Sequence, residues 1–260
     1  MECLGDIVRK TADSRILAVE AAKASRALEI GKDSGLFCVP KVLNFDAETG
    51  VLEFERLSGL VTLLDLAVCR DERLPELLEK AGQALAVVHE KLVLPEEMKR
   101  EMPPEWMDSS DENVFIHGDF ACINVCFHEP SGELVIVDWS AAPSVGRTPT
   151  FGSRYFDILL FISSLFHGAP WRQILSWDGK GMARTFLKGY RNAAPQIKLS
   201  KFRDYAPKIC RLQRKNISEM ARRRQPLRAA GYVSCQTLMY ARLYLFLHSR
   251  KGSPREGHEL

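Results

Sequence analysis

The chain has 260 residues, of which 46% are hydrophobic and 27% charged, and its formal net charge is +3 at pH 7. This length and apolar content allow a large buried core, in one large domain or in two lobes. The longest apolar run, residues 158–166, is far shorter than the ~20 residues that a membrane helix needs, so we expect no membrane-spanning helix. No internal repeat or low-complexity segment is present.

The cysteines and the N-terminus bear on the cellular compartment. There are seven cysteines, an odd number without zinc-type spacing, which argues against a complete disulfide framework and against a structural zinc site. The first residues lack the charged and then apolar pattern of a signal peptide. We therefore expect a soluble protein of the reducing cytoplasm.

Basic residues are concentrated toward the C-terminus. Residues 201–260 contain 14 Lys and Arg against 4 Asp and Glu, a net charge of +10, whereas the first 200 residues carry a net charge of −7. Such a basic region attracts phosphate, an acidic partner or nucleic acid. No aromatic stacking platform is interleaved with it, so a solvated helix face is favoured over nucleic-acid binding.

The N-terminal part predicts a small sheet and one helix. Residues 7–10 form a strand-like run that ends in a lysine, and residues 14–28 show helical periodicity. A loop is expected at residues 31–35, which begin and end with glycine. Two further strands, 39–45 and 50–55, flank a turn.

The middle of the chain predicts helices that lead to a polar connector. Apolar residues at helical spacing mark residues 62–67 and 74–92. His89 lies near the end of the second of these helices, where we expect it to be packed or hydrogen-bonded. Residues 95–113 are rich in Pro, Glu, Met, Asp and Ser and form the connector.

Three oxygen-bearing side chains surround a predicted hairpin at residues 124–137. Asp119 follows a short apolar run and His117, and Asn124 opens the hairpin five residues later. Asp138 follows the second strand of the hairpin. The hairpin should therefore bring these side chains to one cleft edge, and such a cluster suits a hard cation and a phosphate.

The C-terminal part predicts a series of helices. Residues 155–161 form an apolar helix that Gly168 closes, and segments 182–192, 201–215 and 233–249 follow at helical periodicity. Asp157 lies in the first turn of the apolar helix. The helix dipole stabilises a carboxylate at this position by about 0.3–1 kcal/mol.

The motifs H-G-D-F-A-C-I-N from residue 117 and I-V-D-W from residue 136 resemble the aminoglycoside phosphotransferase/choline kinase family, relatives of the protein kinases. The resemblance implies a two-lobed α+β protein-kinase-like fold that binds ATP and Mg²⁺. By position, it implies that Asp119 is the base for a substrate hydroxyl and that Asn124 and Asp138 hold Mg²⁺. It gives His117 and Asp157 structural roles in supporting the catalytic loop.

The same resemblance extends to the N-terminal part. It implies that Lys10 holds the α- and β-phosphates of ATP and that Glu20 fixes this lysine, with Glu29 as the competing choice. Glu55 and Leu57 match the link between the lobes, where backbone groups hold the adenine.

The expected division of the chain into two lobes, with a short N-terminal lobe, leads to two functional hypotheses. We expect residues 1–58 to form a reduced nucleotide-binding lobe, without the family's first strands and phosphate-covering loop, and residues 59–260 to form the catalytic and substrate-binding lobe. The first hypothesis is an ATP- and Mg²⁺-dependent kinase that phosphorylates a hydroxyl of a small molecule. The alternative is a catalytically weak or inactive binding or regulatory module, which the short lobe favours.

The basic C-terminal helices bear on the acceptor, because in the family these helices wall the acceptor pocket. Aminoglycosides are polycations and need an acidic pocket. The expected acceptor is therefore neutral or anionic and not polycationic.

Overall fold

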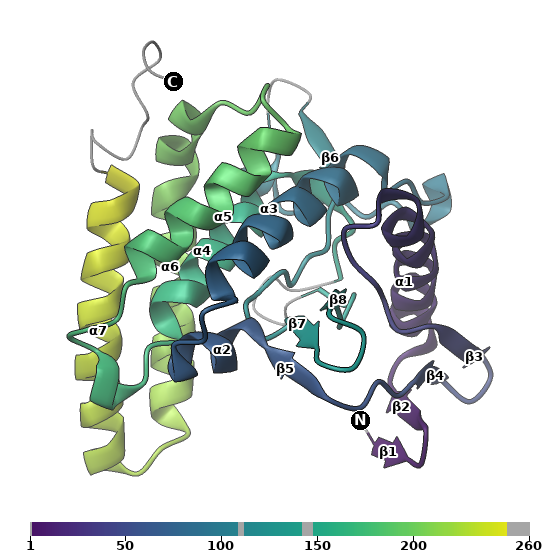
Figure 1. The fold of residues 1–260 in the computed structure, drawn as a ribbon, viewed down its shortest axis with the longest axis horizontal. Helices are drawn as coiled ribbons and strands as arrows, with labels where there is room; N and C mark the ends of the chain where they lie inside the picture. The colour runs from purple at the N-terminus through teal and green to yellow at the C-terminus, as the bar shows by residue number, and fades with distance from the viewer. Residues whose placement is uncertain (1, 109–111, 142–147, 249–260) are drawn as a thin grey trace.

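The computed structural model describes residues 2–108, 112–141 and 148–248. Over these residues the chain folds into a small lobe of one sheet and one long helix and a larger, mainly helical lobe (Figure 1). The small lobe, at the right of the view, contains the N-terminus, and the last two helices form the opposite side of the molecule. The predicted two-lobed α+β fold is confirmed.

The sheet of the small lobe has four antiparallel strands in the order β1-β2-β4-β3. They are β1 (Glu2–Leu4), β2 (Ile7–Thr11), β3 (Val42–Asp46) and β4 (Val51–Glu55). The sequence pattern does not predict β1, which a two-residue turn with Gly5 at φ +59° joins to β2. Arg56 fixes this turn, because its guanidinium donates to the Gly5 carbonyl at 3.1 Å. Lys10 lies in β2 opposite Leu52 of β4.

The long helix α1 (Ser14–Ser34) packs against β3 and β4. The Asp13 side chain caps its first turn by accepting a backbone N–H at 2.9 Å, and Gly35 ends it at φ +66°. The predicted loop from residue 31 is wrong, because the helix continues through Gly31. A Cβ atom at Gly31 would lie 2.3 Å from the Phe37 carbonyl oxygen, so this glycine permits close packing and does not end the helix.

Two small sheets lie around the predicted hairpin at residues 124–137. Their strands are β5 (Leu60–Thr62), β6 (Asn113–Phe115), β7 (Val125–His128), β8 (Glu133–Ile136) and β9 (Phe151–Ser153). One sheet has the order β5-β7-β8 and contains the predicted hairpin, and the other pairs β6 with β9. Cys38 ties the small lobe to this hairpin, since its backbone bonds to Leu134 and Ile136 at 2.7 and 3.0 Å.

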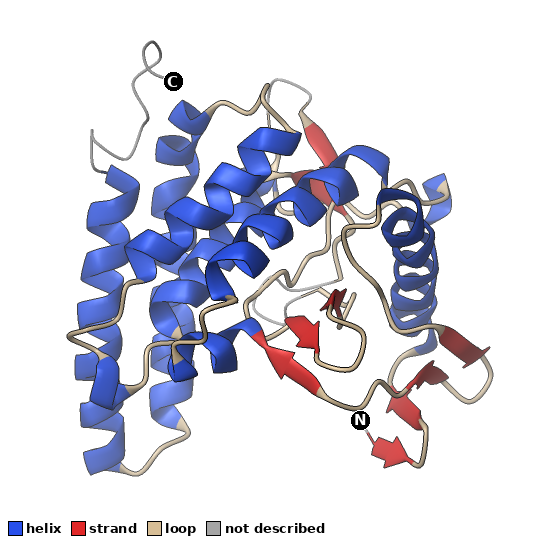
Figure 2. Cartoon of the chain, viewed as in Figure 1, coloured by secondary structure: helices blue, strands red, loops and turns tan. Residues whose placement is uncertain are grey.

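The larger lobe consists mainly of helices (Figure 2). The α-helices are α2 (Leu63–Cys69), α3 (Leu74–Lys91), α4 (Tyr155–His167), α5 (Gly179–Ala193), α6 (Phe202–Arg222) and α7 (Pro226–His248). Short 3-10 turns are η1 (Glu96–Met98), η2 (Pro104–Trp106), η4 (Trp171–Gln173) and η5 (Leu199–Lys201). Helix α4 is buried along most of its length, so it forms the centre of the core.

Glycines allow α3 and α5 to pack closely against each other. A Cβ atom at Gly82 of α3 would lie 2.2 Å from the Phe186 carbonyl oxygen, and one at Gly189 of α5 would lie 1.9 Å from the Glu79 carbonyl oxygen. Both distances are too short for a real contact, so the two helices touch backbone to backbone. The two helices are also joined by a hydrogen bond between His89 of α3 and Tyr190 of α5.

Replacing Gly82 with alanine is expected to lower the free energy of unfolding by about 1–3 kcal/mol, because the methyl group forces α3 and α5 apart. Gly231→Ala is the matched control, since Gly231 is also helical but a Cβ atom there meets nothing within 4 Å. The control should be neutral or stabilising by up to about 1 kcal/mol. Urea unfolding measures both variants, and equal stabilities would contradict the close packing.

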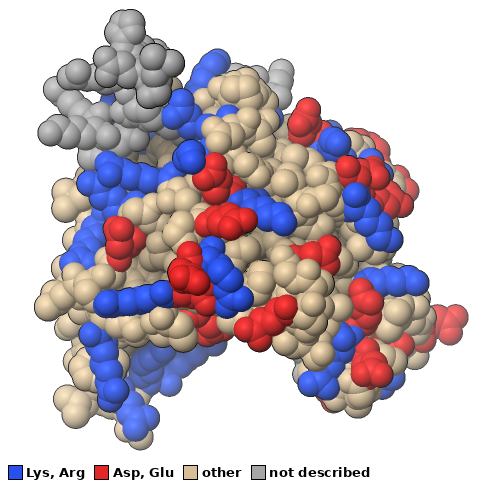
Figure 3. Space-filling model, viewed as in Figure 1, with Lys and Arg blue, Asp and Glu red and all other residues tan. Residues whose placement is uncertain are grey.

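Lys and Arg side chains gather over α6 and α7, whereas acidic and basic side chains are mixed over the small lobe (Figure 3). Two arginines of α6 and its C-terminal end pack on tyrosines of α7. The guanidinium of Arg214 lies 4.9 Å from the ring centre of Tyr240, and that of Arg224 lies 4.0 Å from the ring centre of Tyr232. Part of the basic charge therefore holds the two helices together through cation–π contacts.

Within the described ranges, no helix is long and apolar enough to cross a membrane. All seven cysteines lie in described segments and are free thiols. Burial raises the pKa of the Cys122 and Cys126 thiols to about 11, so both are neutral packing residues.

Candidate active site

The loop that contains Asp119 is shaped by a buried carboxylate, that of Asp157. Gly118 takes φ +89°, in the left-handed region that favours glycine. Asp157, in the first turn of α4, accepts the backbone N–H groups of His117 at 2.7 Å and Gly118 at 2.9 Å. The His117–Asp119 loop is therefore fixed to a buried helix.

A buried chain of hydrogen bonds continues from Asp157 to α3 and α5. Nε2 of His89 lies 3.1 Å from Oδ2 of Asp157, and Nδ1 of His89 lies 2.8 Å from the Tyr190 hydroxyl. Burial lowers the pKa of His89, so its ring is neutral at pH 7. A carboxylate only accepts, so Nε2 carries the proton and Nδ1 accepts from Tyr190. Burial alone would raise the pKa of Asp157, but hydrogen bonds from His89 and Gly118 hold it below its usual range, and Asp157 stays ionised.

Asn124 holds Asp119 in place. Its Nδ2 donates to the Asp119 backbone carbonyl at 2.8 Å and to the Asp119 carboxylate Oδ2 at 3.1 Å. Both amide protons are used in these bonds, so Oδ1 is the Asn124 atom left for a ligand. Burial and the charge of Asp138 raise the pKa of Asp119 to about 6, which makes Asp119 more basic than an ordinary aspartate.

Asp138 follows β8 at φ 56°, a left-handed conformation that aspartate tolerates better than most residues. Its Oδ1 accepts from Lys10 Nζ at 2.8 Å and from Ser140 Oγ at 2.7 Å. Burial would raise the pKa of Asp138, but Lys10 and Ser140 lower it, so the carboxylate is ionised. Lys10 also binds Glu20 of α1, whose side chain is only 2% exposed.

The structure selects Glu20 over Glu29 as the partner of Lys10. Glu29 lies on the exposed side of α1 and pairs with Arg26 at 2.7 Å. Burial would lower the pKa of Lys10, but the charges of Glu20 and Asp138 more than offset this effect and raise it. The Lys10 ammonium therefore remains charged between the two carboxylates.

These groups border a cleft of about 320 Å³ to which both lobes contribute. Its polar lining includes Lys10, Glu20, Asn124 and Asp138, and its apolar lining includes Val8, Val39, Phe54, Leu57, Leu60, Ile123, Val137 and Trp139. Glu55 also lines it, and the Glu55 carboxylate accepts the Lys41 backbone N–H at 2.7 Å. A mainly apolar cleft with a few convergent charged groups is typical of a cofactor or substrate site.

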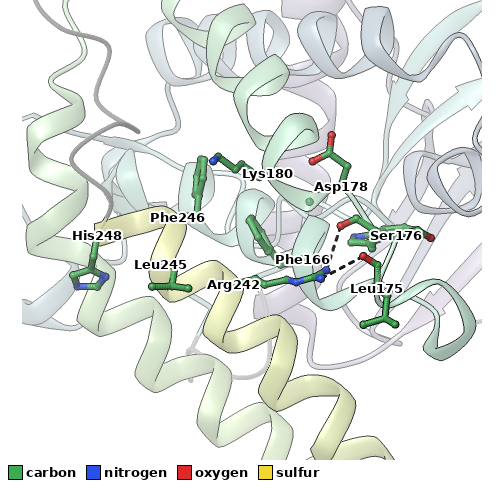
Figure 4. A pocket seen from close by; sticks show the side chains of 11 residues that line it. Phe166, Leu175, Ser176, Asp178, Lys180, Arg242, Leu245, Phe246 and His248 are labelled. Carbon is green, nitrogen blue, oxygen red and sulfur yellow. Dashed lines mark hydrogen bonds between the residues drawn. The ribbon is translucent and has the colours of Figure 1, made fainter.

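A second cavity, of about 670 Å³, lies between the end of α4, the segment before α5 and the last turns of α7 (Figure 4). Arg242 of α7 points into it and donates to the carbonyl oxygens of Ile174 at 2.7 Å and Leu175 at 3.3 Å. Its described lining contains none of the predicted site residues. The convergence of charged groups, and not the size of the cavity, therefore marks the candidate active site.

No motif in the sequence points to Lys23, yet this residue lies beside the His117–Asp119 loop. It is fully buried in α1, and its ammonium donates to the His117 backbone carbonyl. Burial lowers its pKa to about 8, against the opposing effect of the nearby carboxylates. One feature of the sequence could have indicated Lys23. It follows Glu20 by three residues, so the two side chains share a face of the helix.

Neither a family model nor a curated protein matches the chain, but solved structures do. A choline/ethanolamine kinase family protein from Mesorhizobium loti matches 94% of this chain and 87% of its own, with TM-score 0.52 and 15% identity. A glucosamine kinase matches 85% and 73%, with TM-score 0.57 and 15% identity. A choline kinase from Streptococcus pneumoniae matches 93% and 85%, with TM-score 0.52 and 16% identity. The chain therefore has the two-lobed, protein-kinase-like fold of the choline and glucosamine kinases, as its sequence motifs predict.

Proposed function

We propose that the protein is an ATP- and Mg²⁺-dependent phosphotransferase that transfers a phosphoryl group to a hydroxyl of a small molecule. The observation that carries this proposal is the convergence of Lys10, Asn124 and Asp138 on one cleft, with Asp119 hydrogen-bonded beside it. A phosphate-binding lysine, two oxygen ligands for a metal and a base are the parts that kinases use. The fold neighbours, which are choline and glucosamine kinases, support the same reaction class.

The donors of the cleft fit Mg²⁺ when it is bound to a nucleotide. Asn124 Oδ1 and the Asp138 carboxylate are hard oxygen ligands, which Mg²⁺ prefers. No group of three or more His, Cys, Asp or Glu side chains suited to a metal occurs in the described part of the chain. The protein therefore supplies part of the ligand set, and phosphate oxygens and water must supply the rest, as is usual for Mg²⁺. When bound, the metal would neutralise charge on the phosphates.

The remaining residues have separate tasks in this proposal. Lys10, oriented by Glu20, binds the α- and β-phosphates. The apolar lining holds the adenine, and the backbone from Glu55 to Leu57 binds its edge. Asp119, with its raised pKa, accepts the proton of the acceptor hydroxyl.

The two lobes divide these tasks in the proposal. Residues 1–58 bind the nucleotide, and residues 59–260 provide the base, the metal ligands and the acceptor site. We propose a neutral or anionic acceptor from the net charge of +10 over residues 201–260, whose field disfavours the approach of polycations. The described residues that line the cleft lie outside this segment, so its effect on the acceptor would be long-range.

An assay with ATP, Mg²⁺ and a panel of hydroxyl compounds tests the proposal. The panel contains choline, glucosamine, a neutral sugar, a sugar phosphate and a polycationic aminosugar. ADP release is expected to require both Mg²⁺ and an acceptor, and to be fastest with a neutral or anionic member. Fastest turnover of a cationic member, whether choline, glucosamine or the polycation, would contradict the charge preference. The absence of ADP release with every member would contradict phosphoryl transfer to the compounds tested.

One feature of the small lobe favours the alternative, a catalytically weak or inactive binding module. The turn between β1 and β2 has only two residues and is bound to Arg56. The described residues that line the cleft include no glycine. Kinases usually cover the phosphates with a glycine-rich loop, so nucleotide binding without one is weaker. A rise in melting temperature with Mg²⁺-ATP, without ADP release, would support this alternative.

A further inference from the structure

Lys23 is a buried charge to which the proposed chemistry assigns no role. It is 0% exposed and lies on the buried, otherwise largely apolar face of α1. Burying an ammonium group costs several kcal/mol, and an apolar side chain of similar volume is often equally stable or more stable at such a site. Stability alone therefore does not account for a lysine at this position.

The ammonium of Lys23 binds the loop that contains Asp119. Nζ donates to the backbone carbonyl of His117, 94 residues away in sequence, and a Cβ atom at Gly118 would lie 3.7 Å from Nζ. Asp157 accepts the backbone N–H groups of the same two loop residues. The loop is therefore held by both lobes, through Lys23 from the small lobe and Asp157 from the large lobe.

A single helix turn links this contact to the ion pair in the cleft. Glu20 precedes Lys23 by three residues, so the two side chains lie on one face of α1. Glu20 binds Lys10, and Lys10 also binds Asp138. Because the helix is rigid over one turn, a displacement of α1 from the large lobe would break the loop contact and disturb the ion pair together.

We propose that Lys23 is a positioning residue that locks α1 onto the His117–Asp119 loop and so couples the phosphate-binding lysine of the small lobe to the base of the large lobe. This inference rests on the proposed phosphotransferase function. The carboxylates that act on Lys23 and favour its charged form are those of Asp157, Glu20, Asp119 and Asp138. They keep the ammonium available for the loop carbonyl at neutral pH.

Three variants test the contact between Lys23 and the His117–Asp119 loop. Lys23→Met removes the ammonium and approximately preserves the side-chain volume. Lys23→Gln retains a hydrogen-bond donor without the charge and serves if the methionine variant does not fold. Lys32→Met is the matched control, since Lys32 is an exposed lysine on the same helix.

Hydrogen–deuterium exchange of the peptide over residues 114–124 measures directly how often the His117–Asp119 loop opens. Lys23→Met is expected to exchange at least about 10-fold faster in this peptide, because the loop opens locally more often. The glutamine variant should lie between Lys23→Met and wild type, and Lys32→Met should match wild type. Exchange in Lys23→Met equal to that of the control would overturn the proposal, as would a uniform increase along the whole chain.

Steady-state kinetics tests the coupling to turnover. With the best acceptor, Lys23→Met should lower kcat at least about 10-fold, since misplacement of the reacting groups slows transfer strongly. An unchanged kcat in a variant whose loop exchanges faster would overturn the coupling. If wild type shows no phosphoryl transfer, the proposed function fails, but the exchange comparison still decides whether Lys23 locks the loop.

Discussion

Replacement of Asp119 with asparagine is expected to lower kcat by about 10²–10⁴-fold, because Asp119 is the proposed general base and such a base contributes a factor of this size. The amide oxygen can still accept the hydrogen bond from Asn124, which now reaches Oδ2 of Asp119 at 3.1 Å, so the loop should keep its shape. Nucleotide binding should therefore survive. The measurement is kcat for ADP release together with the rise in melting temperature that Mg²⁺-ATP causes.

The same variant should be more stable than wild type at neutral pH. Burial and Asp138 raise the pKa of Asp119 to about 6, above its value of about 3.9 in the unfolded chain. A carboxyl with a raised pKa favours folding below about pH 3.9, and this contribution is lost as the pH rises through about 6. Asp119→Asn should then gain about 1–2 kcal/mol at pH 7.5, after allowance for the partial exposure of the side chain.

Two outcomes would contradict these expectations for Asp119. Retention of wild-type kcat in Asp119→Asn would show that the carboxylate is not the base. A gain in stability that is as large at pH 4 as at pH 7.5 would show that it does not come from ionisation of Asp119. Urea unfolding at the two pH values separates these cases.

Asp138→Asn is expected to abolish the thermal shift caused by Mg²⁺-ATP and to lower kcat by at least about 10³-fold, because positioning and charge neutralisation provide most of the catalysis in phosphoryl transfer. The variant removes the charge of a proposed oxygen ligand and the ion pair with Lys10 at 2.8 Å. Asparagine tolerates the left-handed backbone of this position, φ 56°, so the variant should fold. Calorimetry with and without Mg²⁺-ATP measures the shift.

Asp33→Asn is the matched control for Asp138→Asn, since Asp33 is exposed near the end of α1. The control should keep the full thermal shift and the full kcat. A shift in Asp138→Asn as large as that in the control would exclude Asp138 as a metal ligand. If the melting temperature of wild type rises with Mg²⁺-ATP but not with ATP alone, the metal takes part in nucleotide binding.

The hairpin and its polar residues follow from local sequence. Two short apolar runs on either side of a turn at Gly132, which takes φ +72°, are sufficient to predict β7 and β8. Asn124 binds Asp119 only five residues away, so sequence spacing alone places the two side chains together. Local contacts of this kind leave a clear pattern in one sequence.

The details of α1 are not local and were harder to predict. Gly31 has the pattern of a helix end, but it is required by the Phe37 backbone that packs against it. Glu20 and Glu29 are both plausible partners for Lys10 from spacing. Rotation of the helix on the sheet directs Glu20 into the cleft and Glu29 toward the surface.

By itself, the sequence determined the α+β pattern and the motif residues Asp119, Asn124 and Asp138, because short-range spacing and turn chemistry specify them. Only the tertiary structure decided that Glu20 lines the cleft and that Lys23 contacts the His117–Asp119 loop. The physical reason is that the rotation of α1 is set by its packing on β3, β4 and a loop 94 residues away. Contacts between such distant segments leave no periodic signal in a single sequence.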